Sequence, residues 1–330
     1  MHQFTLSRPT DISAAIAAHA RDAHLAFIAG GTDLIGLMKD RVTLPERLLD
    51  INRLTDLAQV EALPDGGLRI GALARMSDVA AEPHVRSHFP VIAESLLFAA
   101  SGQLRNMATI GGNIMQRTRC TYFRDEDDLP CNKRRPGSGC SARFGLNRNH
   151  AIFGWSDDCV TTHPSDLAVA FAALDANVLI HGPGGKRSIP FTEFHVLPGN
   201  PPVDNVLERG DLIVAIEVPP RIEGRASHYF KLRDRESYEF ALVSAAAAVA
   251  IRAGRIDSAR LALGGVAHKP WRLKAAESAL RGLSLDDTDA LKAAIAASFT
   301  DARPLAHNAF KIDLAQRVAL RALETAGTRI

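Results

Sequence analysis

Residues 115–162 form a long polar segment without a sustained hydrophobic period, and all four cysteines of the chain lie in it. Their spacing is Cys-x10-Cys-x8-Cys-x18-Cys, from Cys120 through Cys131 and Cys140 to Cys159. Free cysteine is usually a small buried hydrophobe, whereas these thiols lie among charged residues, glycine and proline. A segment of this length without regular structure is generally functional or disordered. The cysteines therefore predict convergence on an iron-sulfur cluster, a zinc ion or a pair of disulfides.

The length and composition restrict the classes of protein that this chain can form. At 330 residues it exceeds the size of one hydrophobic core, so two or three domains are expected. A net charge of +2 with 6% aromatic residues and no basic stripe argues against a nucleic-acid partner. The longest apolar stretch, residues 241–251, is too short for a membrane span. Four cysteines are also too few for a secreted scaffold built on disulfides, which makes disulfides the weakest alternative.

The amino terminus bears on where the protein is made. It has no basic stretch followed by an apolar core and a small-residue cleavage site. The pattern predicts a protein with no signal of its own, synthesised in the cytoplasm.

Hydrophobic periodicity places the regular elements on both sides of the cysteine segment. Helices are expected at 11–24, where Asp11 is the N-cap, and at 34–41, 76–100 and 164–176, and two amphipathic helices are expected at the end of the chain. Strands are expected at 25–30, 47–51, 68–73, 177–182, 211–219, 227–233, 241–252 and 259–267. The pattern thus predicts an α+β protein.

Two paired-glycine turns are candidates for binding an anion. IAGGTDL at 28–34 and TIGGNI at 109–114 each read as a turn after an apolar strand, where missing side chains let backbone amides approach a ligand. Neither matches GxGxxG or GxxxxGK[ST], so the Rossmann and P-loop fingerprints are absent. Two such turns suit the two phosphates of a pyrophosphate.

Five motifs occur in the order AGGTDL, TIGGNI, PSDLA, KLRDRESYEFALVSAAAAV and LALGGVAHKPWR. In this order, from about Phe4 to the carboxy terminus, the chain resembles the FAD-binding subunit of the xanthine dehydrogenase and carbon monoxide dehydrogenase family of molybdenum hydroxylases. The resemblance implies a two-part FAD-binding domain followed by a C-terminal domain with a small antiparallel sheet and helices. The implied boundaries are 1–58 and 59–222 for the two FAD-binding parts, with the cysteine-rich insertion at 115–162, and 223–330 for the C-terminal domain.

The same resemblance implies the residues that contact FAD. The first glycine loop and the second would hold the pyrophosphate, Asp166 the ribityl or ribose hydroxyls, Ile213 and Lys231 would lie near the flavin ring, and Ala99 would flank the adenine. The implied cofactor-binding residues are Phe27, Ile28, Ala29, Gly30, Gly31, Thr32, Asp33, Leu34, Ala108, Thr109, Gly111, Gly112, Asn113, Asp166, Ile213 and Lys231. The alternatives are that Asp166 only caps its helix and that Lys231 is a solvated strand residue.

The insertion departs from most of the family, which passes from GGNI to the PxSD-like motif within a few residues. It is similar to a smaller group, the bacterial periplasmic aldehyde oxidoreductases and, with different spacing, the benzoyl-CoA-type reductases, whose flavin subunits carry an additional 4Fe-4S cluster. That likeness implies Cys120, Cys131, Cys140 and Cys159 as the cluster ligands. Zinc remains an alternative, although paired Cys-x2-Cys knuckles are absent. Five basic residues would offset the cluster's negative charge, or form a solvated face: Arg119, Arg124, Lys133, Arg134 and Arg135.

The resemblance also implies the function. A large partner subunit with a molybdenum cofactor would oxidise an aldehyde, and a small partner with 2Fe-2S clusters would pass electrons to FAD on this chain and on to an external acceptor. No catalytic acid or base is then needed here. The assembled complex could be exported to the periplasm on a partner's twin-arginine signal. A standalone FAD-dependent oxidoreductase and a zinc-stabilised assembly module are the alternatives.

Overall fold

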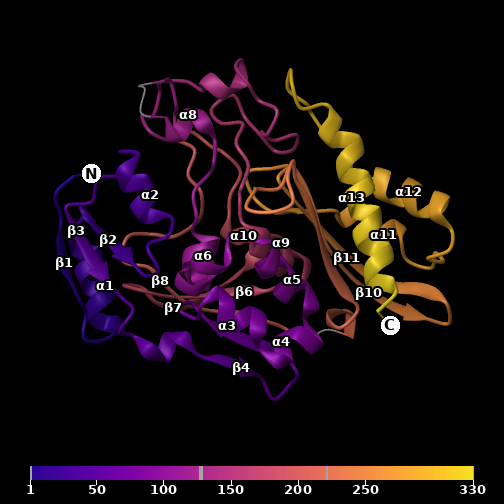
Figure 1. Ribbon diagram of the computed structural model, residues 1–330, viewed down its shortest axis with the longest axis horizontal. Helices are drawn as coiled ribbons and strands as arrows, with labels where there is room; N and C mark the ends of the chain where they lie inside the picture. The colour runs from indigo at the N-terminus through magenta and orange to yellow at the C-terminus, as the bar shows by residue number, and fades with distance from the viewer. Residues whose placement is uncertain (1, 126–128, 221, 330) are drawn as a thin grey trace.

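Three sheets follow one another along the chain in the computed structural model, which describes residues 2–125, 129–220 and 222–329 (Figure 1). The first sheet is parallel, with strand order β1-β3-β2. Its strands are β1 (Thr5–Ser7), β2 (Leu25–Ile28) and β3 (Arg47–Asp50). Two helices make the connections, α1 (Ile12–Arg21) and α2 (Leu34–Lys39). The expected N-cap of α1 is confirmed, because the Asp11 carboxylate accepts a hydrogen bond from the amide of Ala14 at 2.8 Å.

The second sheet is antiparallel, with strand order β4-β5-β8-β6-β7. Its strands are β4 (Val60–Ala62), β5 (Leu68–Gly71), β6 (Asn177–Gly182), β7 (Gly185–Pro190) and β8 (Leu212–Val218). The sequence analysis missed β4 and β7, which form the two edges of this sheet. Both strands are short and largely exposed, so neither carries an apolar signal.

Short helices gather around this second sheet. They are α3 (Met76–Ala81), α4 (Pro83–His88), α5 (Pro90–Phe98), α6 (Gly102–Met107), α7 (Ile110–Ile114), α9 (Asp166–Ala173) and α10 (Phe191–Phe194), with the 3-10 turn η1 (Thr55–Ala58) before β4. The helix expected over 76–100 is divided into three, because Pro83 and Pro90 each begin a new helix. Proline lacks the amide that an interior helical position needs.

The third sheet is antiparallel and belongs to the C-terminal part. Its strands are β9 (Ser227–Leu232), β10 (Val243–Arg252), β11 (Arg255–Gly264) and β12 (Trp271–Arg272), with η3 (Ile222–Gly224) before them. Three helices follow rather than the two expected: α11 (Lys274–Ala279), α12 (Thr288–Ala296) and α13 (Phe310–Gly327). The first of them, α11, is a six-residue helix between β12 and α12. The expected C-terminal antiparallel sheet with helices is confirmed.

The alanine run of β10 explains how this sheet is covered on both faces. Ala246 and Ala248 pack into the core that contains α5 and α9, whereas Ala245 and Ala247 pack into the core of α11, α12 and α13. Successive side chains of a strand point to opposite faces, and small ones let helices approach closely. All eight residues of α9 are consequently buried, which fixes the carboxylate of Asp166 at its first position.

The cysteine segment leaves this body at the top of the view in Figure 1, near the label α8. Among the described residues of 115–162 the only helical elements are α8 (Thr121–Arg124) and the 3-10 turn η2 (Ser141–Arg143). Residues 126–128 of the predicted insertion lie outside the described residues. A hydrogen bond between the hydroxyls of Thr118 and Thr161 nevertheless joins the two ends of the segment.

Lys311 fastens the cysteine segment to the C-terminal part. This side chain is fully buried in the first turn of α13, and its Nζ donates to the carbonyls of Gly265 at 2.7 Å and His150 at 3.2 Å. Burial, with a smaller contribution from the nearby Arg148, lowers the pKa of Lys311 to about 7. The ammonium is therefore held at the edge of protonation at neutral pH.

We expect Lys311→Met to remove a pH dependence of stability. The unfolded lysine keeps its ordinary pKa of 10.5 and binds a proton at pH 7 and at pH 9, whereas the folded side chain releases its proton above about 7. The free-energy cost of burying the Lys311 ammonium is complete below pH 7 and decreases as the pH rises above 7. Between pH 7 and 9 the free energy of unfolding of the wild type should therefore increase by about 2 kcal/mol relative to that of Lys311→Met. Urea unfolding at both pH values measures this difference. An equal pH response of the two proteins would contradict it.

Candidate functional site

The first glycine loop lines a cavity of about 550 Å³, here called the glycine-loop cavity. All eight residues predicted from this loop, Phe27 to Leu34, line it. Gly30 is required because a Cβ atom there would overlap the carbonyl oxygen of Met107. Gly31 has φ +70°, a left-handed conformation that L side chains rarely adopt. The loop is therefore held in a shape that exposes backbone to the cavity.

The second glycine pair lies on the same cavity but in a different local structure from the one expected. Thr109, Gly111 and Gly112 line the cavity. The prediction of a turn after a strand is wrong here, because both glycines lie in the short helix α7, which follows helix α6. The Thr109 hydroxyl caps α7 by accepting from the amide of Gly112 at 3.2 Å.

The remaining predicted residues near this cavity divide into two groups. Ile213, at the second position of β8, lines the glycine-loop cavity with both loops. Ala108 and Asn113 are buried beside Thr109 and are not among the lining residues. Asn113 accepts a hydrogen bond from the Ser165 hydroxyl at 2.6 Å, so it links α7 to the start of α9. Ala99 is buried at the end of α5 and lines neither of the two larger cavities.

Asp166 lies on a second cavity of about 330 Å³, the Asp166 cavity. Its carboxylate pairs with the Lys231 ammonium at 2.8 Å and accepts from the Tyr229 hydroxyl at 2.5 Å. Burial raises the pKa of Asp166, and the Lys231 ammonium opposes that rise. The helix-cap alternative is wrong, since Ser165 is the N-cap of α9. The solvated-lysine alternative is also wrong, because the Lys231 side chain is 1% exposed.

We expect Asp166→Ala to destabilise the fold strongly. Removing the carboxylate leaves the Lys231 ammonium buried without a counter-ion, and breaking a buried pair in this way costs about 3–5 kcal/mol. The free energy of unfolding from urea titration measures it, and adding Lys231→Met to the Asp166→Ala chain should recover more than half of the loss. A loss below about 1 kcal/mol, typical of an exposed pair, would contradict this account.

The four cysteines lie around one small cavity of about 10 Å³, here called the cysteine cavity. All four are free thiols in this structure. Burial, with a smaller contribution from the other thiols, raises the pKa of Cys120 and of Cys159 to about 12. Among the described residues, there is no group of three or more His, Cys, Asp or Glu side chains that could hold a single metal ion. The thiols thus surround a common space without meeting at one point.

Two polar side chains that the sequence analysis missed hold this cavity together. Asn132 is buried and donates to the carbonyl of Asp158 at 3.1 Å, while its oxygen accepts from the amide of Gly139 at 2.9 Å. It therefore ties together the neighbours of three cysteines. The other is His150, whose Nε2 lies 3.2 Å from the Cys120 sulfur. Position next to a cysteine is the only sequence signal for Asn132, and His150 has none.

The predicted basic residues have different environments. Arg119 and Arg124 pair with the carboxylate of Asp33 at 2.7 and 2.9 Å, so these two bind the glycine loop. Lys133 lines the cysteine cavity, and its side chain is 1% exposed, which excludes a solvated role for it. Arg134 donates to the carbonyl of Asp125, and Arg135 is exposed.

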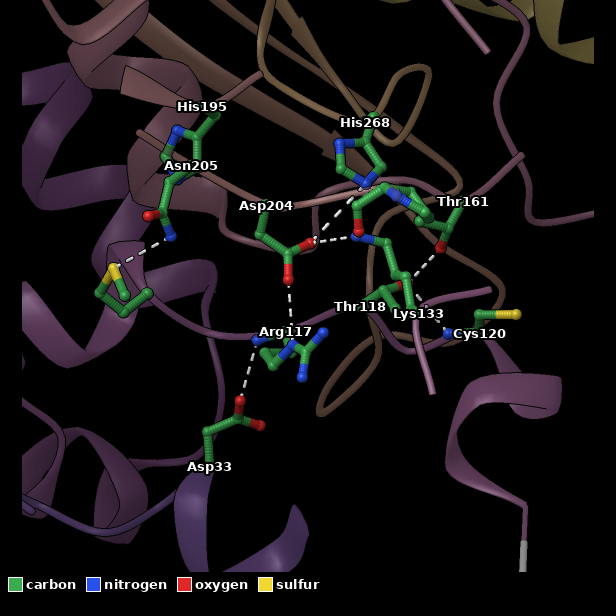
Figure 2. A network of polar contacts seen from close by, with 12 residues as sticks. Asp33, Arg117, Thr118, Cys120, Lys133, Thr161, His195, Asp204, Asn205 and His268 are labelled. Atoms are coloured by element: carbon green, nitrogen blue, oxygen red, sulfur yellow. Dashed lines mark hydrogen bonds and ion pairs between the residues drawn. The ribbon is translucent and has the colours of Figure 1, made fainter. Parts of the chain in front are cut away.

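One hydrogen bond and two ion pairs in series join the glycine loop to the cysteine cavity (Figure 2). Asp33 accepts from the Arg117 amide at 2.9 Å, and the Arg117 side chain pairs with Asp204 at 3.0 Å. Asp204 pairs in turn with Lys133 at 2.6 Å. Asp204 lies in the loop before β8, far in sequence from both partners, so periodicity and motif spacing could not reveal it.

The comparisons with known proteins agree with this fold. Residues 2–221 match the family described as the FAD binding domain in molybdopterin dehydrogenase, and residues 228–326 match the CO dehydrogenase flavoprotein C-terminal domain. Reconstituted CO dehydrogenase from Oligotropha carboxidovorans contains a chain with the same fold, at a TM-score of 0.76 and 24% identity over 99% of both chains. The two matched families together define a flavin-binding subunit of an oxidoreductase.

Two curated relatives extend this assignment. The aldehyde oxidoreductase FAD-binding subunit PaoB of Escherichia coli is 46% identical over 328 residues, which is 99% of each chain. The glyceraldehyde dehydrogenase medium chain of Sulfolobus acidocaldarius is 30% identical over 79% of this chain and 74% of its own. The chain belongs to the FAD-binding medium subunits of the molybdenum hydroxylase family. No helix of the described residues is both long and apolar enough to cross a membrane.

Proposed function

We propose that this chain is the electron-transfer subunit of a molybdenum-dependent aldehyde oxidoreductase, and that it holds both FAD and a 4Fe-4S cluster. The observation that carries the proposal is the identity of 46% to an aldehyde oxidoreductase FAD-binding subunit over 99% of both chains. A large subunit with the molybdenum cofactor would oxidise the aldehyde. A small 2Fe-2S subunit would pass the electrons to this chain, which would deliver them to an external acceptor.

FAD fits the two larger cavities and the groups that line them. The glycine-loop cavity offers the backbone amides of Gly30 and Gly31, and donors of this kind suit a pyrophosphate. The Asp33–Arg119 pair joins the walls of both cavities, since Asp33 lines one and Arg119 the other. When bound, FAD supplies the ability to take two electrons and release them one at a time. The contacts of Asp166, Ile213, Lys231 and Ala99 with its sugar, ring and adenine parts belong to this proposal.

The cluster is proposed for the cysteine cavity, with Cys120, Cys131, Cys140 and Cys159 as its ligands. A cubane cluster takes four thiolates and tolerates irregular spacing in a long loop. The donor set fits, because four free thiols line this space. Asp158 is the one carboxylate among the described residues that line it. The buried Lys133 ammonium on the same wall would offset the negative charge of the thiolates.

The wider arrangement of the protein is also part of the proposal. The chain is divided at residues 58 and 222 into two FAD-binding parts and a C-terminal domain, with the insertion at 115–162. The complex is assembled in the cytoplasm and exported to the periplasm on a partner's twin-arginine signal. Fractionation of cells that carry that partner with and without its leader tests the export.

Anaerobic reduction of the purified complex tests the proposed function. Adding an aldehyde should bleach the flavin absorption only when the molybdenum subunit is present. Bleaching by substrate of this chain alone would indicate a standalone flavin oxidoreductase. A colourless chain that contains zinc would indicate the assembly module instead.

A further inference from the structure

Lys133 is a buried cation on the wall of the cysteine cavity. Its side chain is 1% exposed, and its position in the sequence is two residues after Cys131. The Nζ atom donates to the Asp204 carboxylate at 2.6 Å and to the Pro202 carbonyl at 3.3 Å. Since burying an ammonium is costly without a paired carboxylate, Asp204 is the group that keeps it there.

Asp204 comes from outside the cysteine segment. It lies in the loop between α10 and β8, and it does not line the cysteine cavity. Its second oxygen accepts from Arg117 Nε at 3.0 Å, and His268 Nε2 lies 3.7 Å from the first. Although burial opposes it, the Lys133 and Arg117 cations hold the pKa of Asp204 well below its ordinary value. Asp204 is thus a fixed anion that the body of the protein presents to the insertion.

The effect of the Lys133 and Asp204 charges on a group in the cavity depends on which of the two lies nearer to it. Lys133 lines the cavity, whereas Asp204, the partner in its ion pair (Figure 2), is not among the lining residues. Adding one electron to a bound cluster makes its charge more negative by one, and a nearby buried cation stabilises that added charge. The pair therefore favours the reduced cluster.

We propose that Asp204 is a positioning residue that holds the Lys133 ammonium against the cysteine cavity, and that this ammonium raises the reduction potential of the cluster bound there. The inference rests on the proposed function, because it needs the 4Fe-4S cluster. It adds that an ion pair between Lys133 of the insertion and Asp204 of the body makes the cluster easier to reduce.

Redox titration of the complete complex, with electron paramagnetic resonance of the reduced 4Fe-4S signal, tests this. Lys133→Met should lower the potential, with about a tenfold smaller ratio of reduced to oxidised cluster at a fixed solution potential, which corresponds to 59 mV for one electron. Asp204 stays paired with Arg117 in this variant, so no unpaired buried charge results. Asp204→Asn should also lower the potential, but by less than Lys133→Met does. Without the Asp204 carboxylate, the Lys133 ammonium is no longer held beside the cysteine cavity.

The double variant separates positioning from direct charge. In the Lys133→Met background Asp204→Asn removes only a negative charge, so it should raise the potential instead of lowering it. Arg143→Met is the control, since Arg143 is a cation of the same segment that pairs with the exposed Asp157 and does not line the cysteine cavity. Its potential should stay close to that of the wild type.

Each outcome decides between the inference and the function on which it rests. Full iron content with an unchanged potential in Lys133→Met overturns the inference alone. If Lys133→Met loses iron, Asp204→Asn decides, and an unchanged or raised potential in that variant overturns the inference. A wild-type complex without the iron of a 4Fe-4S cluster overturns the proposed function and the inference together.

Discussion

Gly31→Val should release FAD from the purified protein, with retention weaker by more than about tenfold, or 1.4 kcal/mol. Gly31 has φ +70°, and a Cβ atom there would lie 3.3 Å from Cγ1 of Ile35. The valine therefore makes the left-handed backbone costly and presses on α2, so the loop must shift. Its amides then leave the positions proposed to hold the pyrophosphate. Flavin absorbance per protein after gel filtration measures the loss.

Gly254→Val is the matched control for this prediction. Gly254 has φ +74° in the turn between β10 and β11, and a Cβ atom there meets no other atom within 4 Å. Both variants carry the same backbone strain, but only Gly31 lines the proposed FAD site. Normal flavin content in Gly31→Val, or an equal loss in Gly254→Val, would refute the role of the loop.

Single replacement of Cys120, Cys131, Cys140 or Cys159 by serine should remove about four irons from the complex. The four thiols surround one cavity, so the loss of any one should disturb the whole cluster. The 2Fe-2S iron of the partner should remain. Iron and flavin analysis of the four variants measures both, and Ser141→Ala serves as the control because Ser141 lines the same cavity without a thiol. Unchanged iron in all four cysteine variants would sink the cluster and restore zinc as the candidate.

The hydrogen bond and ion pairs at Asp33 connect loss of the cluster to loss of the flavin. Arg117, Arg119 and Arg124 all belong to the cysteine segment and all bind Asp33 of the first glycine loop. A segment loosened by cluster loss should therefore loosen FAD as well. We expect turnover per bound flavin to stay near the wild-type value in the cysteine variants. A collapse of turnover at full flavin content would place the cluster on the obligatory electron route instead.

The parts of the fold that have an apolar period were predictable from the sequence. The alternating cores on the two faces of β10 follow from the run around Ala245 and Ala246, and α1 follows from Asp11 and the period after it. The edge strands β4 and β7 have no such signal, because exposed edges are polar. Pro83 and Pro90 divide the expected long helix, and proline at the start of a helix is itself a signal in the sequence.

The candidate site was predictable where one motif holds all its contacts. The first glycine loop lines its cavity as a continuous stretch, and the four cysteines line one cavity although their spacing is irregular. Asp204 could not be found in this way, because its partners Lys133 and Arg117 are distant in sequence and meet it only after folding. Lys231 shows the same limit, since its pairing with Asp166 depends on how the third sheet packs against α9.

The absorption spectrum of the purified protein, with iron and flavin analysis of the same sample, tests the central claim most directly. The account predicts flavin bands on a broad brown shoulder, one FAD per chain and about four irons that depend on the four cysteines. Flavin bands without the shoulder and without this iron, or a colourless protein that contains zinc, would contradict it.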